Sequence, residues 1–200
     1  MDQNVINMLM SSVESIRTAL DTSPDSWREH TQAIRNMMAS LEFRDTSPDD
    51  SRKEWQVSVI TVFQRVAHAD VDHGGSVVLD IADWCLKQSV VLIQLYPDDV
   101  ALLALIGENW LLRAQQPLIN IHHAEQSSVS SGDSQNATLS CPERQARAQN
   151  AALEAKQRLD TADYVEARTL LLPAVEYLKR AVDAAHAQDK IYGALLVKVR

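Results

Sequence analysis

Apolar residues recur along most of the chain at alternating spacings of three and four, the pattern typical of amphipathic helices. The first segment shows this most clearly, with one stripe formed by Ile6, Leu9, Val13, Ile16 and Leu20. Alternating β-branched residues are scarce, and the 200 residues include only 5 glycines. We therefore predict an all-α protein with about seven to nine helices and almost no strand.

Two segments of the form Thr-Ser-Pro-Asp, at 22–25 and 46–49, mark expected helix starts. The serine can cap the helix, the proline presets φ at the first helical position, and the acid suits the positive end of the helix dipole. The first start predicts a helix that ends near Phe43. Trp27 and Trp55 fall on the apolar faces that follow the two starts, which favours core packing for both.

The rest of the chain divides at polar or proline-containing breaks. Helices are predicted from Ser76, placed as a cap, to Tyr96 and from Val100 to about Gln115, followed by a short helix over 117–125. The polar segment 126–142 has the composition of a mobile loop, and helical pattern resumes over 143–159 and 163–188. These breaks predict atypical N-terminal helices at 1–70, a helical region at 76–125, a flexible loop at 126–142 and C-terminal helices at 143–200, within one continuous domain.

Charge and targeting features narrow the function classes. The chain has 27 acidic and 19 basic residues, a formal charge of −8, whereas nucleic-acid binding normally needs a basic face. Its start has no basic region, and no apolar stretch approaches the length of a membrane span. We expect an intracellular protein of cytoplasm or nucleus with no membrane or direct nucleic-acid partner. Cys85 and Cys141 are expected to be free thiols.

Candidate chemistry is sparse. His68, Asp70, Asp72 and His73 lie close together in sequence and suggest a metal site, but a solvated loop between helices is the better interpretation because no further ligand pair is evident. No phosphate-binding loop, dinucleotide fingerprint or zinc-protease motif occurs. We expect no catalytic residue, metal or cofactor, and an all-α enzyme or small-ligand binder is the least favoured alternative.

Residues 92–115, LIQLYPDDVALLALIGENWLLRAQ, resemble the junction between two tetratricopeptide repeats. The resemblance rests on Pro97 and on Leu103, Ile106-Gly107 and Trp110 at the spacing of the following helix. Residues 162–182 resemble a second such motif, in which Pro173 is expected to kink or divide the helix.

The resemblance implies a right-handed array of stacked antiparallel helix pairs, with Gly107 where two helices cross closely. It also implies a groove that binds a partner peptide or helix, and the candidate partner-binding residues are Ala101, Ala104, Glu108, Leu111 and Arg113. The predicted function is therefore that of a protein-interaction adaptor or scaffold subunit whose partner offers an apolar or basic surface. The alternative is a self-associating bundle, a homo-oligomer formed through the stripe from Ile6 to Leu20.

Overall fold

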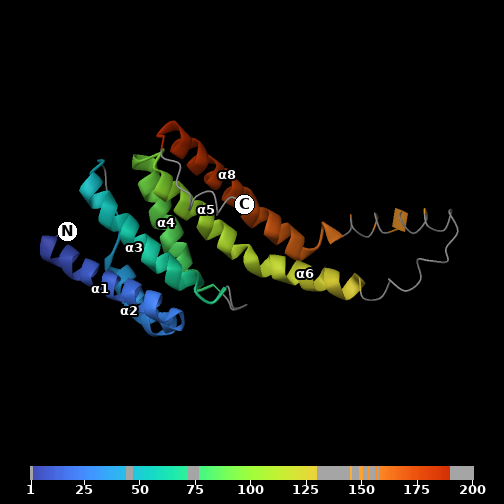
Figure 1. The fold of residues 1–200 in the computed structure, drawn as a ribbon, viewed down its shortest axis with the longest axis horizontal. Coiled ribbons are helices and arrows are strands. Elements are labelled where there is room, and N and C mark those ends of the chain that lie inside the picture. Colours follow the sequence, from blue (N-terminus) through green and yellow to red (C-terminus); the bar gives the residue numbers. More distant parts are fainter. Residues whose placement is uncertain are drawn as a thin grey trace. The chain divides into compact units, whose positions relative to one another are not determined.

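A computed structural model describes residues 2–43, 47–71, 77–129 and 158–189, together with 145, 149–150, 153 and 156. The described residues form helices and no strand, which confirms the all-α class. In chain order the helices are α1 (Gln3–Thr22), the 3-10 turn η1 (Pro24–Ser26), α2 (Trp27–Ser40), α3 (Asp50–His68), α4 (Leu79–Leu95), α5 (Val100–Arg113), α6 (Gln115–Val129) and α8 (Ala162–Ala187), as drawn in Figure 1. The expected total of helices includes stretches outside the described residues and stays a prediction.

The chain separates into two compact units. The first unit comprises Met1–Leu112 with Pro173–Arg200, and the second comprises Arg113–Leu172. The first unit contains α1 to α4, nearly all of α5 and the C-terminal half of α8, whereas the second contains α6 and the N-terminal half of α8.

Within the first unit, α3 and α4 form an antiparallel pair. At one end of the pair the Asp49 backbone N–H donates to the Tyr96 hydroxyl (2.5 Å), and at the other the Val78 N–H donates to the Ala67 carbonyl (2.8 Å). Between these ends the buried Cys85 thiol lies 3.8 Å from the Ile60 carbonyl, so the thiol is enclosed by the pair.

Alternate helices run parallel and meet at a nearly constant offset along the sequence. Between α1 and α3, hydrogen bonds join residues that are 41 and 44 positions apart in the sequence. The separation is 45 positions between α2 and α4, and 41 and 45 positions between α3 and α5. Helices α1 to α5 therefore stack as successive antiparallel pairs. The offset is longer than the 34-residue period of a tetratricopeptide repeat.

The core of this unit is made by the predicted apolar stripes. Leu9, Val13, Ile16 and Leu20 are all buried in one cluster with residues of α2 to α5. Four of the five side chains of this stripe are thus already covered within the chain, and self-association through the stripe stays a prediction.

The core packing expected for Trp27 and Trp55 is confirmed. Trp27 is buried, and Trp55, Trp84 and Trp110 are partly buried against the core cluster. Phe43, which follows α2, packs edge-on against Trp55 and Trp84 with ring centroids 5.5 and 5.7 Å away.

The helix starts agree only in part with the predicted caps. Ser23 occupies the N-cap position before η1, with Pro24 directly after it, but its hydroxyl makes no capping hydrogen bond. For α3 the cap is Asp49, whose carboxylate accepts from the Arg52 N–H (3.1 Å). Helix α4 begins at Leu79, three residues later than predicted, and Ser76 lies outside the described residues.

Two further expectations are corrected along α6 and α8. Helix α6 continues to Val129, so the first residues of the predicted loop 126–142 are helical, and the remainder lies outside the described residues. Helix α8 continues through Pro173, so of the two expected effects the division is wrong, whereas the kink stays a prediction. Proline has no N–H, so α8 lacks one internal hydrogen bond at this point.

An exposed ion pair between α2 and α4 predicts a pH-dependent contribution to stability. The Arg35 Nε lies 2.6 Å from Asp80 Oδ2, and this hydrogen bond with its charge holds the pKa of Asp80 below its usual value of 3.8. Because the folded-state pKa is lowered, the stabilisation is present above that value and is lost as the pH falls through the folded-state pKa. Asp80→Asn should lower the melting temperature by about 1–2 °C at pH 7, since both side chains are half-exposed.

Thermal melts of the wild type and Asp80→Asn between pH 7 and about pH 3 check this expectation. The difference between the two proteins should shrink steadily over the acidic part of that range and should also fall at high salt. A difference that stays constant with pH would assign the effect to packing instead.

Candidate functional site

The predicted partner-binding residues of α5 share one face of that helix. Ala101, Ala104, Glu108 and Leu111 are spaced by three, four and three residues, which places them in one row. Ala101 is exposed and the other three are half-buried. The remaining faces of α5 are occupied by buried side chains: Leu102, Leu103, Leu105, Ile106 and Asn109, together with Gly107.

The N-terminus of α5 is fixed by Asp99. One carboxylate oxygen accepts from the Leu102 N–H (3.0 Å), and the other lies 3.0 Å from Lys53 Nζ of α3. Burial alone would lower the pKa of Lys53, but the hydrogen bonds and charges of Asp99 and Asp50 outweigh it and raise the pKa. Lys53 also lies 4.8 Å from the centre of the Tyr96 ring. The lysine therefore stays charged and holds α5 against α3.

The middle of α5 is tied to α3 and α4 by a buried polar network. Asn109 is fully buried, and its Nδ2 donates to Gln64 Oε1 (3.1 Å) and to the Ala82 carbonyl (3.0 Å). Gln64 in turn donates from Nε2 to the Leu105 carbonyl (3.0 Å). These bonds fix the rotation of α5, which determines which of its faces remains open.

On a third side, α5 contacts the C-terminal half of α8. A Cβ added at Gly107 would lie 2.7 Å from Leu178 Cγ, so the two helices touch at this glycine. The predicted close crossing at Gly107 is present, with α8 as the second helix. Gln188 Nε2, just beyond α8, donates to the Asp98 carbonyl (2.9 Å) and closes the end of this contact.

Arg113, the fifth predicted residue, belongs to the second unit. In that unit α6 and the start of α8 lie side by side, joined by Asn120 Nδ2 donating to Asp163 Oδ1 (3.2 Å) and by the Tyr164 hydroxyl donating to the Glu125 carboxylate. The bond to Glu125 raises the pKa of Tyr164. The predicted set is thus divided, with four residues in one row on α5, whereas Arg113, the last residue of the same helix, does not follow the spacing of that row.

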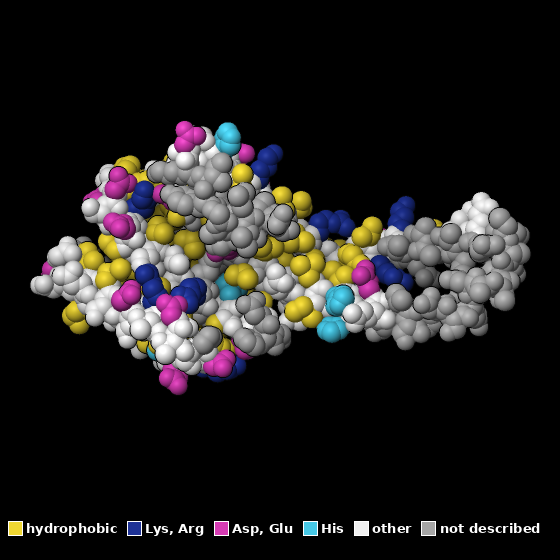
Figure 2. Space-filling view, in the orientation of Figure 1, with side chains coloured by type: hydrophobic (Ala, Val, Ile, Leu, Met, Phe, Trp, Pro, Cys, Tyr) yellow, Lys and Arg dark blue, Asp and Glu magenta, His cyan; other side chains and the backbone are white. Residues whose placement is uncertain are grey.

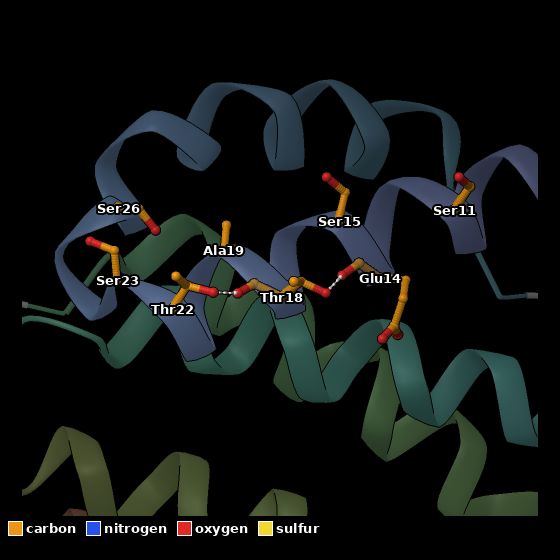
Figure 3. A pocket seen from close by; sticks show the side chains of 8 residues that line it. All are labelled: Ser11, Glu14, Ser15, Thr18, Ala19, Thr22, Ser23 and Ser26. Atoms are coloured by element: carbon orange, nitrogen blue, oxygen red, sulfur yellow. Dashed lines mark hydrogen bonds between the residues drawn. The ribbon is translucent and has the colours of Figure 1, made fainter.

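A groove in the first unit, which the sequence did not predict, runs along α1 (Figure 3). It has a volume of about 780 Å³ and is lined mainly by small side chains: Ser11, Ser15, Thr18, Ala19 and Thr22 of α1, with Ser23 and Ser26 at its end and Glu14 at its edge. In Figure 3 the side chains of Ser15 and Ala19 point into the gap between α1 and α2. The signal available in the sequence was the run of small residues opposite the apolar stripe of α1.

Exposed hydrophobic side chains lie at the N-terminal part of α1, visible at the left of Figure 2. Met8 is 73% exposed and Val5 51% exposed. Elsewhere on that face of the molecule, basic and acidic side chains lie next to one another over α1 and α3, where Arg65 pairs with Asp21 (2.7 Å). Large exposed apolar side chains on α1 are therefore confined to its N-terminal part.

The described residues contain neither a cluster of metal-binding side chains nor a membrane-spanning helix. Among them no group of three or more His, Cys, Asp or Glu side chains is arranged to hold a metal ion. Asp72 and His73 of the predicted metal alternative lie outside the described ranges, as does Cys141. No described helix has the length and apolar character needed to cross a membrane.

Comparison of the chain with protein-family models, with curated proteins and with solved structures finds no match. The tetratricopeptide resemblance therefore stays a prediction.

Proposed function

We infer that this chain is a protein-interaction scaffold subunit that binds a helix or extended segment of another protein along the open face of α5. The observation that carries this inference is that α5 is held on three sides, by α3, α4 and α8, whereas the row from Ala101 to Leu111 stays partly open. A rigid helix with one open row supports binding because the partner does not have to order it.

The chemistry of the row favours a particular kind of partner. Ala101 and Ala104 are small and allow another backbone to approach closely, and Leu111 adds an apolar contact. Glu108 lies in the same row but already interacts within the chain, so the apolar residues of the row favour a partner with an apolar stripe. At 1.5 Å per residue, the 14 residues of α5 provide a surface about 21 Å long, enough for about four turns of a partner helix.

Affinity purification of the full chain from its native cells, followed by mass spectrometry, tests this function. The wild type should retain one protein in near-stoichiometric amounts. Ala101→Arg should reduce the retained amount by about tenfold, because a charged side chain on the open row would clash with an apolar partner and remain poorly solvated. Ala101 is exposed, so this change should leave the melting temperature unchanged.

The matched control is Gln94→Arg, which places the same side chain at an exposed position of α4. It should retain the partner as well as the wild type does. Equal loss with both variants, or retention of only substoichiometric proteins that salt removes, would count against the open face of α5 as the binding surface.

A further inference from the structure

One face of α1 stays mostly exposed beside α2 in the described part of the chain, and it combines large and small side chains in a fixed order. Along it lie Val5, Met8, Ser12, Ser15, Ala19 and Thr22, with alternating spacings of three and four residues. Five of the six are exposed, and Ala19 is half-buried. The large apolar residues occupy the first third of the helix and small residues the rest, and of these small residues Ser15, Ala19 and Thr22 line the groove.

The groove offers apolar surface although its residues are formally polar. The hydroxyls of Ser12, Thr18 and Thr22 donate to the carbonyls of Met8, Glu14 and Thr18 in the same helix, at 3.1, 2.9 and 2.8 Å. Figure 3 shows the last two of these bonds turned along the helix. Thr18, Ala19 and Thr22 therefore expose mainly methyl groups to the groove, whereas the Ser15 hydroxyl points into it (Figure 3). Because apolar atoms make up most of the lining, the groove suits an apolar side chain better than a polar ligand.

The electrostatics of this face permit two copies of the chain to meet there. The chain carries a formal charge of −8, so two copies repel each other overall. None of the six residues of the row is charged. Glu14 at the groove edge is paired with Arg17, whose guanidinium lies 3.4 Å away. The row is thus a surface where contact between copies brings no unpaired like charges together.

We propose that two copies of this chain associate through their α1 helices, which pack antiparallel about a two-fold axis near Ser12 and Ser15. In that arrangement Met8 of each copy lies opposite Ala19 of the other, within the groove, and Val5 lies opposite Thr22. A two-fold contact requires a surface that is complementary to itself, which this order of large and small residues provides. Methionine fits such an irregular groove because its unbranched side chain adapts.

The size of the contact determines its strength. Helix α1 has 20 residues and a length of about 30 Å, and one helix pair buries less area than the roughly 1,200 Å² at the lower end of stable interfaces. The dimer is therefore weak and reversible, and it forms as the protein concentration rises. It leaves the open face of α5 free and does not depend on the proposed partner.

Sedimentation velocity of the full chain from about 1 µM to about 1 mM tests the association. The wild type should shift from monomer to dimer across this range. Met8→Glu should weaken the dimer by about tenfold or more, because it places a carboxylate in the apolar groove of the other copy. Leu79→Glu, which changes a 60% exposed apolar residue at the start of α4, is the matched control and should dimerise as the wild type does.

Cross-linking tests the antiparallel geometry separately. In a Cys141→Ser background, the pair Met8→Cys and Ala19→Cys should form disulfide-linked dimers rapidly, whereas Met8→Cys alone should link slowly because the two Met8 positions lie at opposite ends of the contact. A monomer at every concentration, an equal response to Met8→Glu and Leu79→Glu, or faster linking by Met8→Cys alone would each overturn the proposal.

Discussion

Asn109→Leu is expected to destabilise the chain by about 2–3 kcal/mol, one of the two largest effects we predict. Asn109 is fully buried and donates two hydrogen bonds from Nδ2, to Gln64 Oε1 and to the Ala82 carbonyl. Leucine has a similar volume, so the change removes the donors without opening a large cavity. The cost arises because both oxygens stay buried and lose a donor that water cannot replace.

Urea unfolding monitored by circular dichroism measures the change in the free energy of unfolding. In a thermal melt, the melting temperature should fall by about 5–10 °C for a chain of this size. The double variant Gln64→Leu with Asn109→Leu provides the diagnostic comparison. Replacing both polar partners removes the unsatisfied amide as well as the bond, so the double variant should cost clearly less than the sum of the two single variants.

Two results would contradict this account. If Asn109→Leu is neutral, the network does not fix α5. If the two single costs simply add, the side chains contribute independently and the bond between them is not the cause.

The faces of the helices could be predicted from the sequence because helical periodicity is local. Val13 and Ile16 lie in the core as their stripe predicts, and Ala101 and Ala104 lie on the less buried side of α5. A period of 3.6 residues determines which side chains share a face, and burial of apolar side chains then turns that face inward. These steps need no knowledge of the neighbouring helix.

The identity of the neighbouring helix could not be predicted in the same way. Gln64 and Asn109 are 45 residues apart, and each taken alone is a polar residue on an otherwise apolar helix. Only their pairing makes burial tolerable, and pairing depends on the offset between α3 and α5. For the same reason, the sequence indicated a close crossing at Gly107 but gave no means of choosing α8 as the second helix.

The groove along α1 shows a third kind of limit. Helix α1 carries two rows at spacings of three and four, one through Leu9, Val13 and Ile16 and one through Met8 and Ala19. Stronger hydrophobicity identified the first row, which the fold buries. The second row matters only because α2 leaves most of it exposed, a property of the assembled helices that α1 alone does not contain.

Gly107→Ala is expected to destabilise the chain by about 1–2 kcal/mol, and Gly107→Val by about 3 kcal/mol or more. The added Cβ would lie 2.7 Å from Leu178 Cγ, 2.9 Å from its Cδ2 and 3.1 Å from its backbone nitrogen. Leu178 is itself buried, so α8 or its side chain must shift to make room. The sign of the stability change is informative. Alanine favours a helix over glycine by about 0.5–1 kcal/mol, so Gly107→Ala destabilises the chain only if the crowding costs more than this gain.

The matched control is Ala101→Gly at the exposed N-terminal end of the same helix, which should cost at most about 0.5 kcal/mol through helix propensity alone, because the full difference applies to helix interiors. Gly107→Ala and Ala101→Gly should therefore both destabilise the chain, the first through crowding against Leu178 and the second through lower helix propensity. In a Leu178→Ala background the nearest obstructing atoms are gone, and Gly107→Ala should become nearly neutral in urea unfolding. Stabilisation by Gly107→Ala in the wild-type background would mean that α5 and α8 do not approach as closely at Gly107 as the structure has them.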